Sequence, residues 1–535
     1  MKKQFSLSSV SIAIVAALLL GAFLQSVISG DNIYQQVNKF AEILNNAEKN
    51  YVDEVDTEKL VESAINGMLE GLDPHSTYIP AKQMQKVNED FQGSFEGIGV
   101  EYDIINDTLL VVSPIPGGPS EALGIQAGDK IVQIDTFNAV GIKRDDVPKR
   151  LRGKKGTHVK VEIVRSGEEK RLEFDIIRDK IPLYTVDVSF MVNSEVGYIS
   201  VNRFAATTYQ EFSDGMMKLK SQGMKKLVLD LRNNPGGYLD QAVKMVDEFL
   251  PGGKKIVYTK GRQNAFNEDY GSSGRGKYTD ITVILMVNQG SASASEIVSG
   301  AIQDWDRGLI VGETTFGKGL VQRQFPLGDG SAYRLTNARY YTPTGRLIQR
   351  PYGTDHDAYR KAAYEREEQE GDNIDHQEEN DSTKPKFITP GGRTVFGGGG
   401  ITPDYFIKAE RLEKYSAQLR GRSIFVEFAN KYLDRVGADI RAKYENNRVE
   451  FLEKFTVTQE MIDEVVTIAT AKKIEFAKEE FDKDISYIKA AMKAQIGRTL
   501  FGNEGSYPIL LNEDSQFLKA VSLFPEAEKL AHLGK

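Results

Sequence analysis

The spacing of apolar positions changes along the chain, and each change marks a predicted domain boundary. Residues 31–92 repeat apolar positions every three or four residues, as Leu60, Ala64 and Met68 do, which predicts a helical region. Residues 93–180 contain short apolar runs separated by Gly- and Pro-rich turns, which predicts a small β-rich domain. We expect its strands at 108–112, 130–134, 158–164 and 172–177, and short helices near 119–123 and 145–151.

Strand and helix patterns alternate between residues 181 and 353. This βαβα order is typical of an α/β core with a largely parallel sheet. We expect strands at 196–201, 227–231, 281–287 and 309–311, and helices at 209–222, at 238–250 and from 294 onward.

The remaining part of the chain divides into three segments. Residues 354–390 are polar and rich in glutamate, which predicts a solvated insertion or a flexible loop. Residues 391–410 contain a strand-like run and are expected to return to the core. Residues 411–535 are charged, with an amphipathic stripe near Val465, which predicts a helical C-terminal domain. This domain could dimerise the protein, bind an adaptor or pack as a lid.

The first 30 residues have the pattern of an export signal. Lys2 and Lys3 precede an apolar run whose strongest part is Ile12–Leu24. That part is short for a membrane span, and no clear A-x-A cleavage site follows it. Residues 1–30 are therefore expected to be either a signal peptide or an N-terminal membrane anchor. Both alternatives place the protein in the periplasm or on the extracytoplasmic face of the inner membrane.

Composition excludes several classes of function. The 535 residues carry a net charge of −8, which argues against nucleic acid as a partner. There are no cysteines, so thiolate catalysis, cysteine-bound zinc and disulfides are excluded. The five histidines show no metal-binding spacing, and we expect no metal and no organic cofactor.

Ser293 lies where a buried strand is expected to end and a helix to begin. Its neighbours in Gly290–Glu296 are small, so a substrate backbone can approach, and the free N–H groups of a helix start favour an oxyanion. A serine at this place is also a common helix cap. This segment alone therefore leaves both interpretations open.

Lys318 lies between Gly317 and Gly319, after the next predicted strand. If this place is dry, the amine is more easily neutral and can accept a proton from a serine. A surface lysine or a phosphate-binding lysine are the alternatives. The sequence does not complete a GxxxxGK[ST] motif, because Gly319 follows the lysine.

A third turn, Asp230–Gly237, follows another buried strand and ends in two glycines. The N–H groups of Gly236 and Gly237 could form an oxyanion hole with that of Ala294. An ordinary strand-to-helix turn is the simpler interpretation.

Together, these segments resemble the carboxy-terminal processing protease family, also called tail-specific proteases. The separation of 25 positions between Ser293 and Lys318 is the spacing that this family shows. The resemblance implies a ClpP/crotonase-like α/β core with an inserted PDZ domain. It also implies that Ser293 is the nucleophile, that Lys318 is the general base and that Gln322 orients the lysine. Glu296 matches an acidic position of the family for which we expect a structural role. Further matching segments are residues 72–78, 339–346 and 400–404.

The β-rich region resembles the PDZ domain of the same family. Gly97-Ile98-Gly99 stands where a PDZ domain binds a terminal carboxylate. By the same resemblance, Arg152 couples the PDZ domain to the active site. A surface arginine in a turn is the simpler alternative.

The resemblance implies a serine endopeptidase that recognises C-terminal tails through its PDZ domain and forms an acyl-enzyme. Its partners would be proteins or peptides with exposed C-termini, and residues 411–535 could bind an adaptor or a second copy. A catalytically silent PDZ scaffold or holdase is the alternative, although both Ser293 and Lys318 are present. An acyl-CoA enzyme of the crotonase type is disfavoured by the leader and the PDZ-like region.

Overall fold

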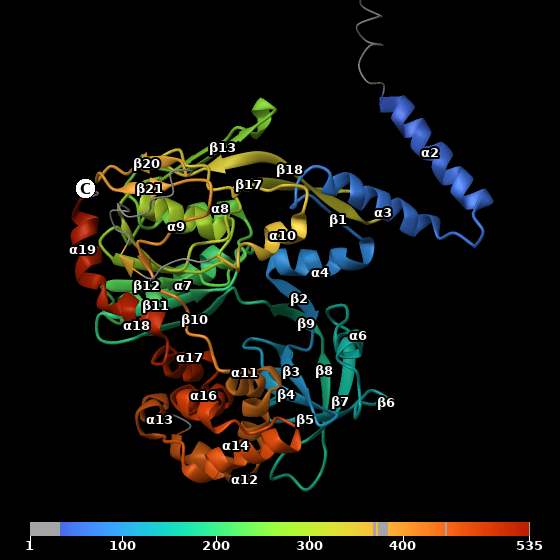
Figure 1. The fold of residues 1–535 in the computed structure, drawn as a ribbon. Helices are drawn as coiled ribbons and strands as arrows, with labels where there is room; N and C mark the ends of the chain where they lie inside the picture. The colour runs from blue at the N-terminus through green and yellow to red at the C-terminus, as the bar shows by residue number, and fades with distance from the viewer. Residues whose placement is uncertain (1–32, 367–370, 373–383, 445–446, 534–535) are drawn as a thin grey trace, which may run out of the picture. The chain divides into compact units, whose positions relative to one another are not determined.

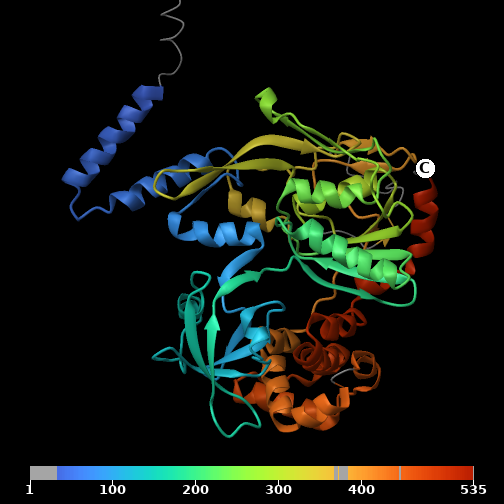
Figure 2. The ribbon, with the colours of Figure 1, turned by 180° about the vertical axis from the view of Figure 1, so that it is seen from behind.

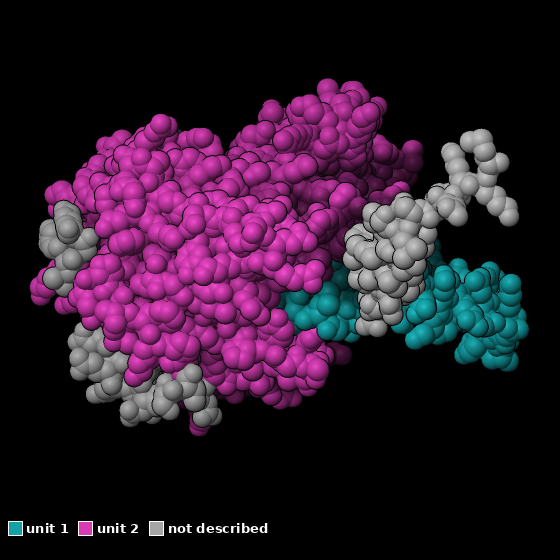
Figure 3. All heavy atoms as spheres, turned by 90° about the horizontal axis from the view of Figure 1, so that it is seen from above, with its two compact units in different colours: residues 1–78 teal, residues 79–535 magenta. Residues whose placement is uncertain are grey.

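The structure, a computed structural model, describes residues 33–366, 371–372, 384–444 and 447–533. It divides into two compact units, residues 1–78 and 79–535 (Figure 3). The predicted leader at residues 1–30 lies outside the described residues. None of the helices in the described ranges has the length and apolar character that a membrane span requires.

The first unit is helical where it is described. It contains α2 (Ile33–Asn50) and α3 (Thr57–Glu70), and β1 (Thr77–Ile79) lies at its end. Asp56 caps α3 by accepting a hydrogen bond of 3.1 Å from the N–H of Lys59. The predicted helical pattern is confirmed here.

The β-rich region forms an antiparallel sheet whose strand order is β3-β4-β5-β7-β8, and all four predicted strands are present. A two-stranded ribbon, β2 with β9, carries the chain into this PDZ-like module and out of it again. The helix α4 (Ala81–Gln92) comes directly before the ribbon. The bounds are β2 (Ser94–Gly97), β3 (Val100–Ile105), β4 (Thr108–Pro114), β5 (Lys130–Ile134), β6 (Phe137–Asn138), β7 (His158–Val164), β8 (Leu172–Ile177), β9 (Asp179–Pro182), α5 (Pro119–Ala122) and α6 (Val147–Leu151).

The predicted α/β core is confirmed as a seven-stranded sheet in the order β10-β11-β12-β15-β16-β22-β19. The strands from β11 to β22 are parallel, and the two outer strands run antiparallel to their neighbours. The bounds are β10 (Val186–Met191), β11 (Val196–Val201), β12 (Lys226–Asp230), β15 (Thr282–Val287), β16 (Gly308–Gly312), β19 (Gly371–Asp372) and β22 (Tyr405–Phe406).

The two faces of this sheet are covered by different parts of the chain (Figures 1 and 2). Along β15, Val283 and Leu285 pack with α7 (Thr208–Ser221), α8 (Leu239–Asp247) and α9 (Ala294–Asp304). The alternate residues Ile284 and Met286 face the other way, as the pleat of a strand requires. They pack with residues of α17 (Asn503–Leu511), α18 (Ser515–Ser522) and α19 (Phe524–Leu533), among them Leu511, Phe517, Phe524 and Leu530.

The predicted helical C-terminal domain is confirmed, and it contacts both the core and the PDZ-like module. Beside the module, the carboxylate of Glu427 accepts a hydrogen bond of 3.1 Å from Asn106, and Lys130 forms an ion pair of 2.8 Å with Asp434. In Figures 1 and 2 these orange and red helices lie next to the blue strands of the module. The bounds are α11 (Lys414–Gly421), α12 (Ile424–Tyr444), α13 (Arg448–Lys454), α14 (Gln459–Ala471), α15 (Lys478–Lys483) and α16 (Ile485–Phe501).

Two features of the core differ from expectation. A second sheet of β17 (Leu320–Pro326), β18 (Ala332–Tyr341), β13 (Lys255–Gly261) and β14 (Asp269–Gly271) had no clear sequence signal.

The segment 354–390, predicted as a solvated insertion or a flexible loop, contains the short helix α10 (His356–Lys361), most of whose residues are exposed, with Tyr359 as the buried exception. Tyr359 is buried there against Phe316, with ring centroids 5.9 Å apart, because its apolar ring outweighs the polar residues around it. The short strands β20 (Lys386–Ile388) and β21 (Thr394–Phe396) pair with each other. Residues 367–370 and 373–383 lie outside the described ranges.

Candidate active site

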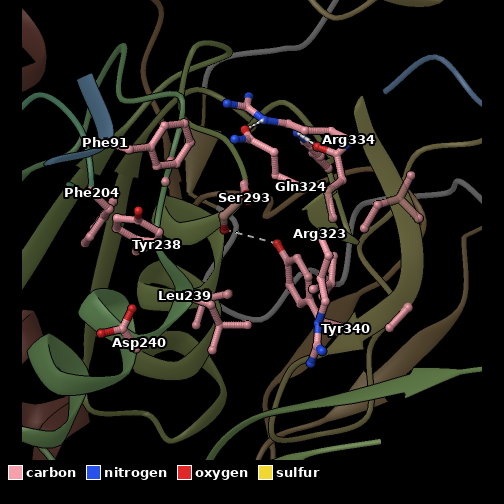
Figure 4. A pocket seen from close by; sticks show the side chains of 18 of the residues that line it. Phe91, Phe204, Tyr238, Leu239, Asp240, Ser293, Arg323, Gln324, Arg334 and Tyr340 are labelled. Atoms are coloured by element: carbon pink, nitrogen blue, oxygen red, sulfur yellow. Dashed lines mark hydrogen bonds between the residues drawn. The ribbon is translucent and has the colours of Figure 1, made fainter. Parts of the chain in front are cut away.

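A cleft of about 1000 Å³ opens near the carboxyl ends of β12 and β15 (Figure 4). Its lining comes from α4, the turn after β12, the start of α9 and the strands β17 and β18. Five of the predicted site residues line this one cleft: Ser293, Lys318, Gln322, Gly236 and Gly237. The fold therefore brings together segments that lie far apart in the sequence.

Among the three serines of the turn after β15, only Ser293 lines the cleft. Ser291 is buried, and its hydroxyl donates to the carbonyl of Leu231 at 2.8 Å. Ser295 is also buried and donates to the carbonyl of Asn234 at 2.9 Å. Ser293 itself has φ 55° and ψ −110°, a conformation that non-glycine residues rarely adopt. Such strain is often found at functional sites, where the surrounding structure maintains it.

Glu296 connects the serine turn to the lysine loop. Its carboxylate is fully buried and accepts hydrogen bonds from the backbone N–H groups of Ser293 (2.8 Å), Gly317 (2.7 Å) and Lys318 (2.9 Å). It also accepts one of 2.6 Å from the hydroxyl of Thr315. Burial raises the pKa of Glu296, and these hydrogen bonds oppose that rise by stabilising the ionised form. The carboxylate thus fixes the spacing of the two segments that carry Ser293 and Lys318.

The amine of Lys318 is directed by Gln322. Lys318 Nζ donates a hydrogen bond of 2.9 Å to the side-chain oxygen of Gln322, on β17. The flanking glycines are needed because a Cβ on Gly319 would lie 2.8 Å from the backbone nitrogen of Gln349. Gly317 has φ +88°, and a Cβ there would lie 3.0 Å from the side chain of Arg350.

Of the three predicted oxyanion donors, one already donates a hydrogen bond inside the protein. The N–H of Gly236 donates to the side-chain oxygen of Asn234 at 2.9 Å. Within the described ranges, the N–H groups of Gly237 and Ala294 donate to no other protein group. Gly236 brings the two segments close, since a Cβ on it would lie 2.8 Å from the nitrogen of Ala294. Gly237 and Ala294 are therefore the better candidates for donors, with Gly236 as the close-packing residue between them.

The predicted tail-binding residues lie in the module and do not line the cleft. Gly97 ends β2, and the side chain of Ile98 is buried in the core of the module. Gly99 has φ +75°, and a Cβ on it would lie 3.1 Å from the side chain of Ile181. The loop is therefore tightly packed on one side.

Arg152 contacts the helix that leads into the cleft. Its guanidinium forms an ion pair of 2.5 Å with Glu89 of α4 and lies 4.4 Å from the ring centre of Phe95. The same helix contributes Phe91 to the cleft lining. The side chain of Arg152 thus links the module to a helix that borders the cleft.

Two cleft residues were missed in the sequence. The hydroxyl of Tyr340 donates to the carbonyl oxygen of Ser293 at 3.1 Å (Figure 4). Phe91 packs edge-on against Tyr238 at 5.1 Å between centroids. A helical or alternating pattern identifies a buried face, but it does not say which cleft that face borders. In the described part of the chain, no cluster of His, Cys, Asp and Glu side chains could hold a metal ion.

Four family models match the chain. Peptidase family S41 matches residues 195–359, and a PDZ domain matches residues 97–176. The N-terminal domain of the activating protease CtpB matches residues 23–83. A family of unknown function, DUF8443, matches residues 415–502.

Curated proteases match most of the same region. A carboxy-terminal-processing protease of Bartonella bacilliformis is 39% identical over 349 residues, which cover 63% of this chain and 79% of that protein. A probable CtpA-like serine protease of Staphylococcus aureus is 37% identical over 341 residues, covering 63% of this chain and 68% of the relative. Among solved structures, the photosystem II D1 C-terminal processing protease has 29% identity, covers 57% of this chain and 88% of its own, and has a TM-score of 0.33. The family assignment therefore depends on the sequence relatives. The chain belongs to the carboxy-terminal-processing proteases of peptidase family S41 and is a serine-type peptidase.

Proposed function

We propose that this protein is an endopeptidase that cleaves with a Ser293–Lys318 dyad and binds the C-terminal tails of its substrates through the PDZ-like module. One observation carries the proposal. Ser293 and Lys318 line the same cleft, and the buried carboxylate of Glu296 holds the backbone of both.

The dyad would work through an acyl-enzyme. Ser293 Oγ attacks the scissile carbonyl carbon while Lys318 Nζ accepts the hydroxyl proton. Lys318 then donates that proton to the leaving amine as the C–N bond breaks. Lys318 Nζ then accepts a proton from a water molecule that attacks the ester carbon, and it returns this proton to Ser293 Oγ as the ester C–O bond breaks. The hydrogen bond to Gln322 orients Nζ of Lys318. The N–H groups of Gly237 and Ala294 stabilise the negative oxygen of each tetrahedral intermediate.

Tail binding is supported by the shape of the module. Within the described residues β3 pairs only with β4, so its other edge can accept a peptide as an added strand. Gly97, Ile98 and Gly99 lead directly into β3, where their N–H groups can bind a terminal carboxylate. Arg152 would connect tail binding to the cleft through its ion pair with Glu89.

The site of action follows from the leader. Lys2, Lys3 and the apolar run after them support export, and we propose action in the periplasm or at the outer face of the inner membrane. Binding of an adaptor or a second copy to residues 411–535, and an anchor at residues 1–30, remain predictions.

The test uses residues 31–535 and an unstructured protein with an apolar C-terminus. We expect Ser293→Ala and Lys318→Ala each to lower kcat by at least about a thousandfold, since each removes a group that acts in the reaction. Ser299→Ala is the matched control, because this buried serine lies in the same helix α9 but does not line the cleft. Removal of the last three residues of the substrate should raise KM.

Cleavage by Ser293→Ala would contradict the dyad. A folded wild-type protein that binds tails but never cleaves them would instead support a silent scaffold. If deletion of residues 93–180 from such a protein restored cleavage, the module would be an inhibitor of the site.

A further inference from the structure

Arg232 lies in the turn that carries Gly237, one of the two proposed oxyanion donors, and it contacts the C-terminal helices. Its guanidinium, 16% exposed, forms ion pairs of 2.7 Å with Asp230 and 2.7 Å with Asp514. It also donates to the side-chain oxygen of Gln516 at 2.8 Å. One cation at the end of β12 is therefore held by its own turn and by residues nearly 300 positions later in the chain.

Both distant partners are themselves fixed. Asp514 caps α18, since its other carboxylate oxygen accepts from the N–H of Phe517 at 3.0 Å. Gln516 is buried, and its amide donates to the carbonyl of Ile407 at 2.7 Å. Side chains with two anchors lose little additional freedom when they bind a third group, so they can define the position of Arg232.

The turn after Arg232 contacts the nucleophile segment at each step. The N–H of Asn233 donates to the side chain of Asn288 at 2.8 Å. The carbonyl of Asn234 accepts from the N–H of Ala292 at 3.0 Å and from the hydroxyl of Ser295 at 2.9 Å, one bond on each side of Ser293. A displacement of Arg232 is therefore passed to the proposed oxyanion donors Gly237 and Ala294.

We propose that Asp514 and Gln516 are positioning residues of the active site, which fix Arg232 and thereby the turn that carries Gly237, one of the two proposed oxyanion donors. The inference rests on the proposed function and adds to it. It assigns a catalytic support role to a region that lies outside both the peptidase match at 195–359 and the DUF8443 match at 415–502.

The charges around Arg232 indicate that Asp514 positions the guanidinium and is not needed to keep it ionised. Burial disfavours the charged guanidinium, but the carboxylates of Asp230 and Asp514 outweigh this and raise the pKa of Arg232. Without Asp514, the cation keeps Asp230 as its partner and stays ionised. The Arg232 guanidinium would lose only the ion pair that fixes it to the C-terminal helix α18.

The experiment compares Asp514→Asn and Gln516→Ala with Glu528→Gln in the full chain. Asparagine caps helices as well as aspartate, so the first variant keeps the start of α18. Glu528 is the matched control, because it forms an ion pair of 2.9 Å with Lys226 at the opposite end of the same strand β12. The readouts are kcat and KM, the rate at which a fluorophosphonate probe labels Ser293, and Tm.

We expect Asp514→Asn to lower kcat and the labelling rate about tenfold with KM nearly unchanged, a smaller loss than removal of an oxyanion donor would give. Gln516→Ala should lower kcat and the labelling rate by a smaller factor, and Glu528→Gln should leave both at the wild-type value. Unchanged kcat in Asp514→Asn would overturn the proposal, as would equal losses in Asp514→Asn and Glu528→Gln together with a lower Tm.

Amide hydrogen exchange separates this inference from the proposed function. If wild type shows no Ser293-dependent cleavage, the proposed function fails. The positioning role is then decided by whether residues 231–238 exchange faster in Asp514→Asn than in Glu528→Gln. Equal exchange in the two variants would overturn it.

Discussion

Two buried carboxylates, Glu296 after the nucleophile and Asp230 at the end of β12, are stabilised in different ways. Glu296 accepts three backbone N–H groups and one hydroxyl, all from the core. Asp230 pairs with Arg232 and accepts a hydrogen bond of 2.7 Å from Tyr198. The first arrangement connects segments of the peptidase core to one another. The second arrangement also includes Asp514 of the C-terminal helices, because Arg232 pairs with both carboxylates. The comparison therefore distinguishes contacts within the peptidase core from contacts that the C-terminal helices add.

The largest effect is expected from Glu296→Ala. Three buried or part-buried N–H groups would lose their acceptor at a cost of about 1–3 kcal/mol each, and the backbone of Ser293 and Lys318 would no longer share a partner. We expect the free energy of unfolding to fall by at least about 4 kcal/mol. We also expect kcat to fall on the order of a hundredfold in the fraction that remains folded. Urea denaturation and initial rates at low temperature measure both.

Glu248→Ala is the matched control for this variant. Glu248 is also buried and hydrogen-bonded, at 2.5 Å to the hydroxyl of Tyr209 and 2.9 Å to the N–H of Lys277, but its partners belong to neither of the segments that carry Ser293 and Lys318. The Glu248→Ala variant should have a lower free energy of unfolding and an unchanged kcat. Equal kcat in the Glu296→Ala and Glu248→Ala variants would show that Glu296 acts on stability alone.

An intermediate effect is expected from Arg232→Met, which keeps the length of the side chain and removes its charge. Asp230 and Asp514 would then be left beside each other without a cation, at a cost of about 3 kcal/mol in the free energy of unfolding. Lys226→Met, which breaks the more exposed pair with Glu528, should cost less than about 1 kcal/mol. Chemical denaturation of both variants measures the difference, and a cost below that of Lys226→Met would contradict the role assigned to Arg232.

The smallest effect concerns pH and sharpens the contrast between the two carboxylates. Burial raises the pKa of Glu296 above its ordinary value of 4.5, so the folded protein retains a proton there that the unfolded chain has released. The stability linked to this group is fully present below 4.5 and is lost as the pH rises through the raised pKa. The Glu296→Gln variant has no ionisable group at this position, so its stability lacks this pH dependence. The unfolding free energy of wild type minus that of Glu296→Gln should therefore decrease with rising pH, and a difference that increases instead would show that Glu296 is stabilised as an anion.

The sequence predicted the strands and helices of the core because their apolar runs are long and regular. For Ser293 and Lys318 the small neighbouring residues left structural interpretations open, and only the resemblance to the protease family, with its spacing of 25 positions, pointed to a dyad. The strand β17 and the first part of β18 were missed because many of their positions are partly exposed on both sides, which removes the alternation that marks a strand.

Partners between distant segments could not be predicted in the same way. The pattern of α17, α18 and α19 shows that one face is buried, but not that it covers the central sheet. Likewise, nothing in the turn Asn233–Gly237 shows that the carbonyl of Asn234 accepts a hydrogen bond from the N–H of Ala292. Such pairings depend on side-chain geometry across the fold, which periodicity does not contain.

The cover on the far face of the central sheet has a consequence for the order in which the protein is made. Val228, Ile284 and Met286 are covered by residues between 511 and 530, which follow the end of β16 at Gly312 by some 200 positions. At about 5–20 residues per second, a ribosome takes roughly 10–40 s to add them. Until these residues have been added, this face of the sheet lacks the apolar cover that it has in the folded protein. Because Arg232 receives Asp514 only at the end of the same interval, the peptidase cannot reach its final form early in synthesis.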